Sequence, residues 1–472
     1  MLRILGRERH ACDGVSRREL LRVGGLSLFG GVTLPQLLRA QRACSASEAP
    51  PRRARSVVLL NLFGGPPHMD MFDLKPQAPA NVRGEFSPIA TSLPGVQICE
   101  LLPQIAGLLD RGTLIRTYSH KYNSHNPYNV LTGFDGGNDR ENYFAKRTDH
   151  PGIGAVCGHF GLGRTDIPPY VMMPAFPGYS QALRRAGPYG GYLGSAHDPL
   201  FTVCEPQFDR ESTGDYDPVI AGGEPVLPSL DQLPDVTVAR LDRRHSLLSE
   251  VEQTVAGIEA SRAPAAMTTF QEQVFSILTG PRTRGAFDLS QEPEATRDRY
   301  GRNLWGSSVL IARRLVEAGS TFITVHWEAK GANHWDLHEN NFGMLRSHLP
   351  QLDRIVSALV TDLDERGLLD STLVVVMGEM GRSPKVNAKS GRDHWPQCGF
   401  ALLFGGGTRK GVVIGATDDI AAYPTDRPVS AGDMGSTIYH LLGIDHERTV
   451  NDLTGRPIPI SHGGAPVWEA LA

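Results

Sequence analysis

The sequence predicts an α/β fold with a mostly parallel central sheet and helices on both faces. Short apolar, β-branched runs that resemble buried strands alternate with longer amphipathic stretches along the chain. Several of these runs are followed at once by acidic and histidine residues, as expected where the carboxyl ends of parallel strands form a functional edge. The 472 residues include 52 glycines and 34 prolines, and this composition favours a loop-rich fold over a helical bundle.

Residues 1–45 are predicted to be a twin-arginine export signal. Arg17 and Arg18 precede the apolar stretch 23–38, which is too short and too rich in glycine to span a bilayer. An amphipathic or signal-anchor helix is the alternative interpretation. We therefore expect a periplasmic or extracellular protein with no membrane span after signal removal, in which residues 46–55 form a linker and residues 56–472 form the α/β domain.

Charge and cysteine usage argue against several kinds of partner and site. The signal contains eight Lys or Arg and three Asp or Glu residues, so its removal changes the net charge from −4 to about −9. A mature chain of this charge is not expected to bind nucleic acid or an anionic membrane. The six cysteines show no paired short spacing, so no thiolate zinc site or redox motif is predicted.

The first predicted strand is Ser56–Phe63, whose mostly apolar sequence indicates a buried strand, and it ends in the sharp turn Gly64–Asp73. A helix around Leu101–Asp110 and a strand at Thr113–Thr117 follow. This second strand leads into the polar segment Ser119–Gly133.

A middle region, from about residue 175 to residue 300, differs in character from the rest of the domain. It contains a Gly/Tyr-rich loop, a passage punctuated by proline, and helical stretches at Leu241–Ala260 and Thr268–Leu278. We expect it to be a mixed helical and loop insertion that covers the edge of the sheet.

The α/β pattern returns after residue 303. Its expected elements are helix Leu304–Ala318, strand Thr321–Val325, helix Leu345–Arg366, strands Thr372–Val376, Phe400–Phe404 and Val412–Ile414, and helix Ser436–Leu442. Gly319 is expected to end the first of these helices. Pro350 either kinks the second helix or lies in its first turn.

Two of these strands are followed by groups of side chains that bind metals. The residues are His326, His334, Asp336 and His338 after the first strand, and Glu379 and His394 after the second. Because the carboxyl ends of neighbouring parallel strands meet at one edge, the two groups look like halves of one metal site. Imidazole and carboxylate ligands favour zinc or manganese over calcium.

Six ordered blocks of sequence together carry a family resemblance. They are Gly64–Asp73, Ala286–Pro293, Tyr300–Asn303, Ala312–Gly319, Trp335–His338 and Gly391–Trp395. With the twin-arginine leader, they resemble the exported bacterial family known as domain of unknown function 1501, over nearly the whole mature chain. That family is placed in the alkaline phosphatase superfamily with the sulfatases, so the resemblance implies an alkaline phosphatase-like fold. It brings no established activity.

The superfamily resemblance implies metal ions at the carboxyl edge of the sheet, one of them held by an Asp/His/His set. Asp336, His338 and His394 match that set in type and order. The close spacing of Asp336 and His338 is less typical, which leaves His334 as a possible substitute ligand.

A second ion, or the attacking water, would be held by carboxylates in the superfamily. Glu379 stands where a ligand Asp is expected, but Met380 replaces the histidine that should follow it. The first strand also lacks its terminal Asp, and His68 or Asp70 would compensate from the following turn. One or two divalent ions are therefore expected.

The nucleophile segment departs further from the superfamily. Aligned on Leu131–Gly133, the sulfatase nucleophile falls on Asn123, which cannot attack an ester. Either Ser124 attacks, a metal-bound water attacks, or no such chemistry takes place. His125 would protonate the leaving group or bind substrate, unless it is simply a loop histidine.

Arg382 and Arg392 suit an anionic ester, because a guanidinium group matches the oxygens of phosphate or sulfate. They would otherwise neutralise nearby carboxylates, with Glu379 as one ion-pair partner.

Structural roles are the alternative for the other candidates. His338 and His394 would then be core imidazoles, and Asp70 would cap its Gly/Pro-rich turn. Asp73 is expected to be structural.

The predicted function is that of an exported metal-dependent hydrolase or transferase acting on a phosphate or sulfate ester. Its partner would be an anionic small molecule or a polysaccharide ester. The alternative is a non-catalytic exported binding protein, associated with polysaccharide, that retains one structural metal. The missing second-site histidine and the Asn at the nucleophile position favour this alternative, whereas the Asp/His/His set and the two arginines favour the enzyme.

Overall fold

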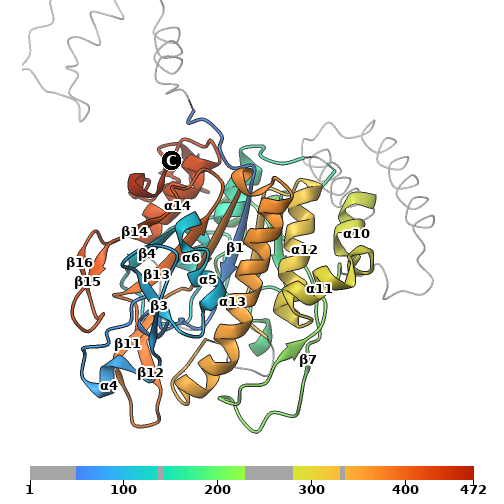
Figure 1. Ribbon diagram of the computed structural model, residues 1–472. Helices are drawn as coiled ribbons and strands as arrows, with labels where there is room; N and C mark the ends of the chain where they lie inside the picture. The colour runs from blue at the N-terminus through green and yellow to red at the C-terminus, as the bar shows by residue number, and fades with distance from the viewer. Residues whose placement is uncertain (1–48, 137–142, 165, 229–279, 330–334) are drawn as a thin grey trace, which may run out of the picture. The chain divides into compact units, whose positions relative to one another are not determined.

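An eight-stranded sheet forms the centre of the computed structural model (Figure 1). The structure describes residues 49–472 except 137–142, 165, 229–279 and 330–334. The strands of the sheet are β1 (Ser56–Asn61), β4 (Gly112–Tyr118), β5 (Tyr170–Met173), β6 (Leu200–Phe201), β9 (Phe322–His326), β10 (Thr372–Met377), β13 (Gly399–Phe404) and β14 (Val412–Ile414).

The strand order is β14-β4-β13-β10-β1-β9-β5-β6. All neighbouring strands are parallel except at β13, which pairs antiparallel with β10 and with β4. The prediction of a mostly parallel sheet is therefore confirmed. The carboxyl ends of β4, β10, β1 and β9 consequently lie along one edge of the sheet.

Helices cover both faces of this sheet, as predicted. They are α3 (His68–Met71), α4 (Ala80–Arg83), α5 (Pro103–Ala106), α6 (Tyr128–Thr132), α7 (Ile153–His159), α10 (Pro281–Phe287), α11 (Glu294–Tyr300), α12 (Leu304–Ala318), α13 (Asn341–Glu365) and α14 (Ala431–Leu441). Figure 1 shows α12 and α13 side by side in front of β1.

The alternation of side chains along β1 divides the core into two parts. Val58 and Leu60 pack in one apolar cluster with residues of α5, α12 and α13. Val57 and Leu59 point to the opposite face and pack in a second cluster with residues of α6, α7 and α14. Burial on both faces explains why the middle of this strand, Val57–Leu60, is a continuous apolar run rather than an alternation with polar residues.

Among the described residues, five pairs of short strands lie outside the central sheet. They are β2 (Pro88–Ala90) with β3 (Gln97–Cys99), β7 (Gln207–Phe208) with β8 (Ala221–Gly222), β11 (Gly381–Val386) with β12 (Arg392–Trp395), β15 (Ala416–Thr417) with β16 (Pro424–Asp426), and β17 (Thr449–Asn451) with β18 (Pro457–Pro459). The β11–β12 pair follows β10 directly and places His394 near the functional edge.

Helix α12 has the bounds that the sequence predicts. The Asn303 side chain caps its first turn by accepting a hydrogen bond from the Gly306 amide, and Gly319 ends it with a left-handed φ of 106°. Helix α13 begins at Asn341, earlier than predicted, so Pro350 lies inside the helix and not in its first turn.

Two predicted helices differ from the structure. The stretch Leu101–Asp110 contains only the short α5 and a separate 3₁₀ turn at Leu109–Arg111. Helix α14 starts five residues before the predicted Ser436, because Ser430 and Asp433 form a reciprocal capping box at its start.

The middle region contributes both to the sheet and to the layer of helices. Strand β6 extends the sheet beyond β5, and α10 and α11 pack against α12. The helices predicted at 241–260 and 268–278, like the export signal, lie outside the described residues.

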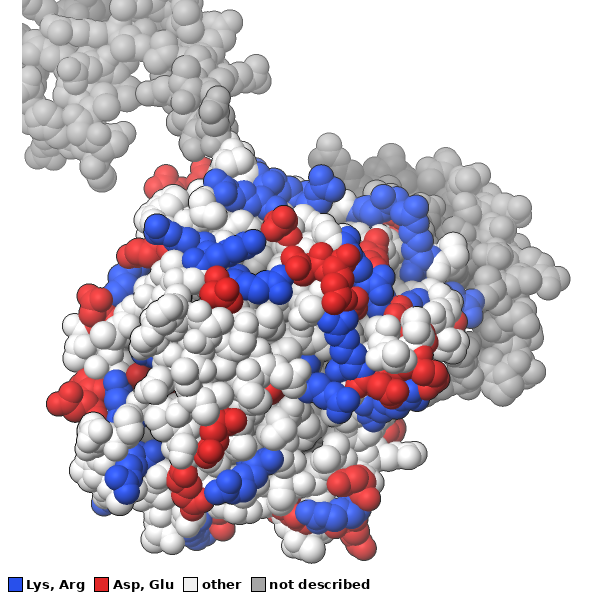
Figure 2. Space-filling view, in the orientation of Figure 1, with Lys and Arg blue, Asp and Glu red and all other residues white. Residues whose placement is uncertain are grey.

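The described helices and the charges on one face of the molecule bear on membrane and nucleic-acid binding. In the described part of the chain, no helix is long and apolar enough to cross a bilayer. On the face in Figure 2, Lys and Arg are interspersed with Asp and Glu, so the described residues there do not form the continuous basic surface typical of nucleic-acid binding.

Candidate metal centre

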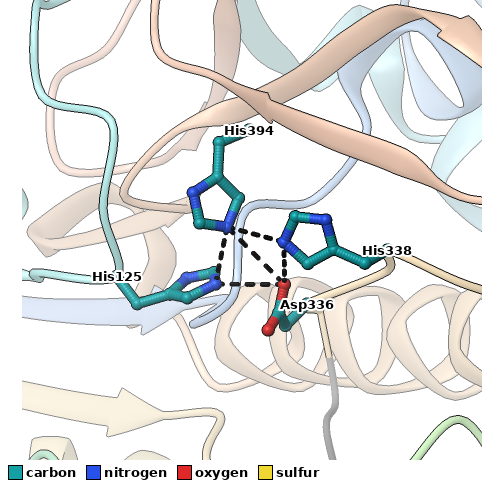
Figure 3. Close-up of side chains that lie close together, drawn as sticks. All are labelled: His125, Asp336, His338 and His394. Atoms are coloured by element: carbon teal, nitrogen blue, oxygen red, sulfur yellow. Dashed lines mark hydrogen bonds and ion pairs between the residues drawn. The ribbon is translucent and has the colours of Figure 1, made fainter. Parts of the chain in front are cut away.

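Four side chains converge at the carboxyl edge of the sheet, as Figure 3 shows. They are His125, Asp336, His338 and His394, and one potential ligand atom of each lies within 4.8 Å of those of the others. These four residues are the centre of the candidate site.

Three separate segments deliver these residues. His125 lies in the loop that joins β4 to α6, Asp336 and His338 lie between β9 and α13, and His394 lies on β12. The β4 and β9 segments come directly from strand ends, and β12 is positioned by its pairing with β11 after β10. The parallel topology therefore brings together residues that are more than 200 positions apart in the sequence.

The spacing of the four ligand atoms fits a single metal ion. His394 Nε2 lies 2.9 Å from His125 Nε2 and 3.0 Å from His338 Nε2. Asp336 Oδ1 lies 3.0, 3.2 and 3.7 Å from the Nε2 atoms of His125, His338 and His394. Ligands about 2 Å from a tetrahedral zinc ion are separated by about 3.3 Å. The observed distances bracket this value.

The second nitrogen of each imidazole is held by an acceptor outside the centre. Nδ1 of His125 lies 3.0 Å from Glu379 Oε1, and Nδ1 of His338 lies 3.2 Å from Asp393 Oδ1. Nδ1 of His394 lies 3.4 Å from the main-chain oxygen of Asn123. When Nδ1 donates to these acceptors, each Nε2 lone pair faces the centre, which is the usual arrangement of metal-binding histidines.

The charges in the centre also favour a cation. Burial alone would lower the pKa of His125, but the carboxylates of Asp336 and Glu379 outweigh burial and raise that pKa to about 9. Burial would raise the pKa of Asp336, yet His125, His394 and Arg382 hold it well below its usual range. In the metal-free protein, a protonated imidazole therefore occupies a position between two carboxylates.

The centre is open to solvent on one side. The side chain of His338 is 34% exposed and that of Asp336 is 25% exposed, whereas His125 is only 9% exposed. A small molecule could therefore approach from the side of His338.

The structure thus brings together the predicted set Asp336, His338 and His394. His125, which the sequence suggested as an acid or a substrate-binding residue, lies among them as a fourth potential ligand. The only advance signal was its position in the nucleophile segment, two residues after Asn123. His334 lies outside the described residues.

Glu379 lies behind His125 and not among the four ligand atoms. Its Oε1 accepts hydrogen bonds from the Gly64 amide, at 2.8 Å, and from His125 Nδ1. The expected ion pairs of Glu379 with Arg382 or Arg392 are not among its contacts. Its position beside His125 makes it a residue that orients a ligand.

Arg382 is fully buried and holds the metal-binding loop in place. It donates hydrogen bonds to the main-chain oxygens of Gly65, at 2.9 Å, of Arg392, at 3.1 Å, and of Gly64, and it lies 2.8 Å from Asp336 Oδ1. The prediction that it binds the ester does not agree with this arrangement, because carbonyl groups and a carboxylate already occupy its guanidinium group.

Arg392 and Asp70 form a buried ion pair, which corrects the predicted role of both residues. Arg392 Nε and Nη2 lie 2.7 and 2.8 Å from the two carboxylate oxygens of Asp70. The remaining guanidinium hydrogens go to the main-chain oxygens of Ser383, Pro384 and Val82. Arg392 has no donor left for a substrate, and the Asp70 carboxylate is used by this arginine and by Asn341.

His68 is also absent from the described centre. Its Nε2 lies 2.8 Å from the main-chain oxygen of Ala421, and its ring is buried. Burial lowers the pKa of His68 and so favours the neutral ring. We conclude that its role is structural, and that the turn after β1 supplies no ligand to the four-residue group.

Ser124 is buried, and its hydroxyl group has no hydrogen-bond partner among the described residues. A serine nucleophile needs a base or a metal to activate it. None of the described side chains lies within hydrogen-bond distance of the Ser124 hydroxyl to act as that base.

The fold and the site together define the class: an α/β protein that carries a candidate metal centre at the carboxyl edge of its sheet. The chain belongs to the family described as "Protein of unknown function (DUF1501)", whose sequence profile matches residues 54–471. This confirms the family resemblance seen in the sequence. Among proteins with curated descriptions, none matches the chain.

Three solved structures that match the chain are distant from it in sequence. The lipoteichoic acid synthase LtaP from Listeria monocytogenes is 9% identical, with a TM-score of 0.38, over 90% of this chain and 78% of that chain. The PsFucS1 sulfatase from Pseudoalteromonas sp. is 13% identical, with a TM-score of 0.34, over 85% and 70%. The phosphonate monoester hydrolase SpPMH from Silicibacter pomeroyi is 11% identical, with a TM-score of 0.34, over 88% and 78%.

Proposed function

We propose that this chain is an exported metal-dependent hydrolase acting on a phosphate or sulfate ester. The observation that carries the proposal is the convergence of three Nε2 atoms and one carboxylate oxygen on one point, with each Nδ1 held by an acceptor. Zinc or manganese is the expected ion, because both accept imidazole and carboxylate ligands. The paired arginines of residues 1–45 support export.

A bound divalent ion would polarise the ester oxygen and activate water at this site. His125, Asp336, His338 and His394 would hold the ion. The exposed side of His338 leaves room for substrate to approach, while Glu379 and Asp393 keep two of the imidazoles in the binding orientation.

Water is a better nucleophile than Ser124 in this proposal. The Ser124 hydroxyl is buried, and the described residues place no base within hydrogen-bond distance of it. Ser124→Ala should therefore leave hydrolysis largely intact, whereas His394→Ala should abolish it.

The test combines metal analysis with a substrate screen. The mature protein, purified without chelators, should contain about one equivalent of zinc or manganese by elemental mass spectrometry, and His394→Ala should contain far less. The metal-loaded protein should then hydrolyse at least one member of a panel of phosphate and sulfate monoesters. A wild-type protein that takes up no metal after reconstitution would exclude the metallohydrolase.

A non-catalytic binding protein with a structural metal is the second candidate. It is favoured by the number of ligands, because four protein ligands are typical of structural zinc, whereas catalytic zinc usually has three and an open position. The engagement of Arg382 and Arg392 by internal partners also favours it. Stoichiometric metal, binding of a sulfated polysaccharide and no turnover of any ester would support this candidate.

A further inference from the structure

We infer that Arg185 is a positioning residue of the metal centre, and that Glu328 holds the loop which delivers Arg185 to the metal-binding segment. The inference rests on the proposed metal site but not on any reaction carried out there. It concerns residues 177–185, a loop of the middle region that none of the predicted site residues belongs to.

Arg185 holds the main chain of a metal-binding residue directly. Its Nη1 donates a hydrogen bond to the main-chain oxygen of His125 at 2.7 Å, and the side chain is almost fully buried. The guanidinium group also lies 5.6 Å from the centre of the Phe63 ring, which itself contacts the His125 ring. Arg185 therefore fixes the main chain of His125, while Phe63 packs against the His125 ring.

Glu328 anchors the loop that carries Arg185. Its Oε2 accepts a hydrogen bond from the Gly178 amide at 2.8 Å, and its Oε1 accepts one from the Ser180 hydroxyl. The main-chain oxygen of Glu328 also accepts a hydrogen bond from the Tyr179 hydroxyl, at 3.0 Å. One buried carboxylate residue thus holds three consecutive residues of the loop.

His326 connects this anchor to the central sheet. Asn61 Nδ2, at the end of β1, lies 2.9 Å from His326 Nδ1, and His326 Nε2 lies 2.9 Å from Glu328 Oε2. Because the amide nitrogen of Asn61 can only donate, Nδ1 must accept, and Nε2 carries the hydrogen that is donated to Glu328. The ends of two neighbouring strands are therefore tied through Glu328 to the loop.

The backbone of Gly178 allows the loop to turn back on itself. Its φ is +85°, and a Cβ atom there would lie 2.6 Å from the Leu183 oxygen and 2.8 Å from Arg185 Cγ. A side chain at this position would displace Arg185. The Gly178 amide also donates a hydrogen bond to Glu328. The turn of the loop and its attachment to Glu328 therefore lie at the same residue.

This loop matters because the position of the His125 backbone determines where its Nε2 atom lies. A metal site tolerates only small displacements of its ligands, and partners outside the ligand shell typically affect affinity by roughly ten- to a hundredfold. Loss of the Arg185 hydrogen bond should therefore weaken metal binding without removing a ligand.

The experiment compares two neighbouring arginines, with zinc as the probe. Arg185→Met should weaken zinc binding roughly ten- to a hundredfold, measured by competition with a chromogenic chelator. Arg184→Met is the matched control, because Arg184 is exposed and stacks on Tyr189, 4.6 Å from the ring centre. The control should keep the wild-type affinity.

Chemical rescue separates positioning from a general loss of structure. In Arg185→Ala, millimolar ethylguanidinium should restore part of the zinc affinity, and it should not change that of His394→Ala. Glu328→Gln should weaken zinc binding in the same direction as Arg185→Met. If Arg185→Met does not fold, Arg185→Lys takes its place, and an intermediate affinity is expected because one donor and the charge remain.

The possible failures are distinguishable. Wild-type affinity in a folded Arg185→Met or Arg185→Lys protein would overturn the inference and leave the metal centre intact. A wild-type protein that binds no zinc or manganese would overturn the proposed metal centre, and the positioning role of Arg185 with it.

Discussion

Each histidine of the candidate centre is oriented by what its second nitrogen contacts. For His125 that partner is the buried carboxylate of Glu379, and for His338 it is the exposed carboxylate of Asp393. A buried carboxylate acts more strongly on its partner than an exposed one, because solvent screens the exposed charge. The two carboxylates are therefore not equivalent.

Glu379→Gln should accordingly weaken metal binding more than Asp393→Asn. We expect a loss of roughly ten- to a hundredfold for Glu379→Gln and a smaller loss for Asp393→Asn. Competition with a chelator of known affinity measures both variants. Equal affinities in Glu379→Gln and wild type would show that this contact does not orient His125.

Asp70 provides a second test at the scale of a single residue. Asp70→Asn should cost about 3–5 kcal/mol of stability, because it leaves the buried guanidinium of Arg392 without its countercharge. Unfolding in urea measures this loss, and the folded fraction should still bind metal. A variant that loses metal but keeps wild-type stability would instead make Asp70 a ligand.

Sequence reasoning was informative about residue types but not about their partners. Asp336, His338 and His394 could be proposed because each follows a strand-like run at the functional edge. The pairing of Arg392 with Asp70 could not be proposed, because 322 positions separate the two residues. Local sequence patterns contain no information about contacts of that range, and so both residues were assigned to the site.

At the scale of elements, the β11–β12 pair is the main feature that the sequence did not reveal. Gly381–Val386 contains a proline and few apolar residues, and so lacks the pattern of a strand. The pair nevertheless sets the position of His394 by placing it opposite Arg382 in the register. Helix α12, in contrast, was predicted with correct bounds because its apolar stripe and both of its ends are encoded locally.

Helix α13 contains a histidine that should make the protein sensitive to acid. Burial lowers the pKa of His348 to about 4, against about 6.5 in an unfolded chain. Between these values the unfolded state binds more protons than the folded state, so stability is complete above pH 6.5 and falls as the pH drops toward 4. The expected loss is about 3 kcal/mol.

Urea unfolding at several pH values, with a chelator present throughout, measures this effect. His348→Leu should lose correspondingly less stability over the same pH range, because no proton can bind there. The His446→Leu variant is a suitable control, since His446 is half-buried and lies outside α13. Equal acid sensitivity in wild type and His348→Leu would exclude His348 as the cause.

For the whole molecule, the centre connects three distant parts of the chain through one ion. A ligand that binds only the folded state stabilises it, by about 4 kcal/mol when it is present at a thousand times its Kd. Removal of metal by a chelator should therefore lower the Tm of the wild-type protein by several degrees in differential scanning calorimetry. The chelator should lower the Tm of His394→Ala much less. An equal decrease in both proteins would show that the chelator acts at a place other than this centre.

The class of fold could be predicted for the whole molecule because burial of a sheet on two faces leaves a clear signature. Runs such as Leu373–Val376 are apolar at every position, and glycine-rich turns follow them. The reversed direction of β13 leaves no such signature, since its sequence is as apolar as that of β10, the strand it pairs with. The direction of a strand is set by the path of the connection that brings the chain back to the sheet. The pattern of apolar residues within the strand does not specify that path.

X-ray absorption spectroscopy of the zinc-loaded protein tests the central claim most directly. We expect one ion whose nearest neighbours are three imidazole nitrogens and one oxygen, at about 2.0–2.1 Å. The imidazole signal should decrease by about one third in His125→Ala. A spectrum with no imidazole contribution, or with one that is unchanged in His125→Ala, would contradict the four-residue centre.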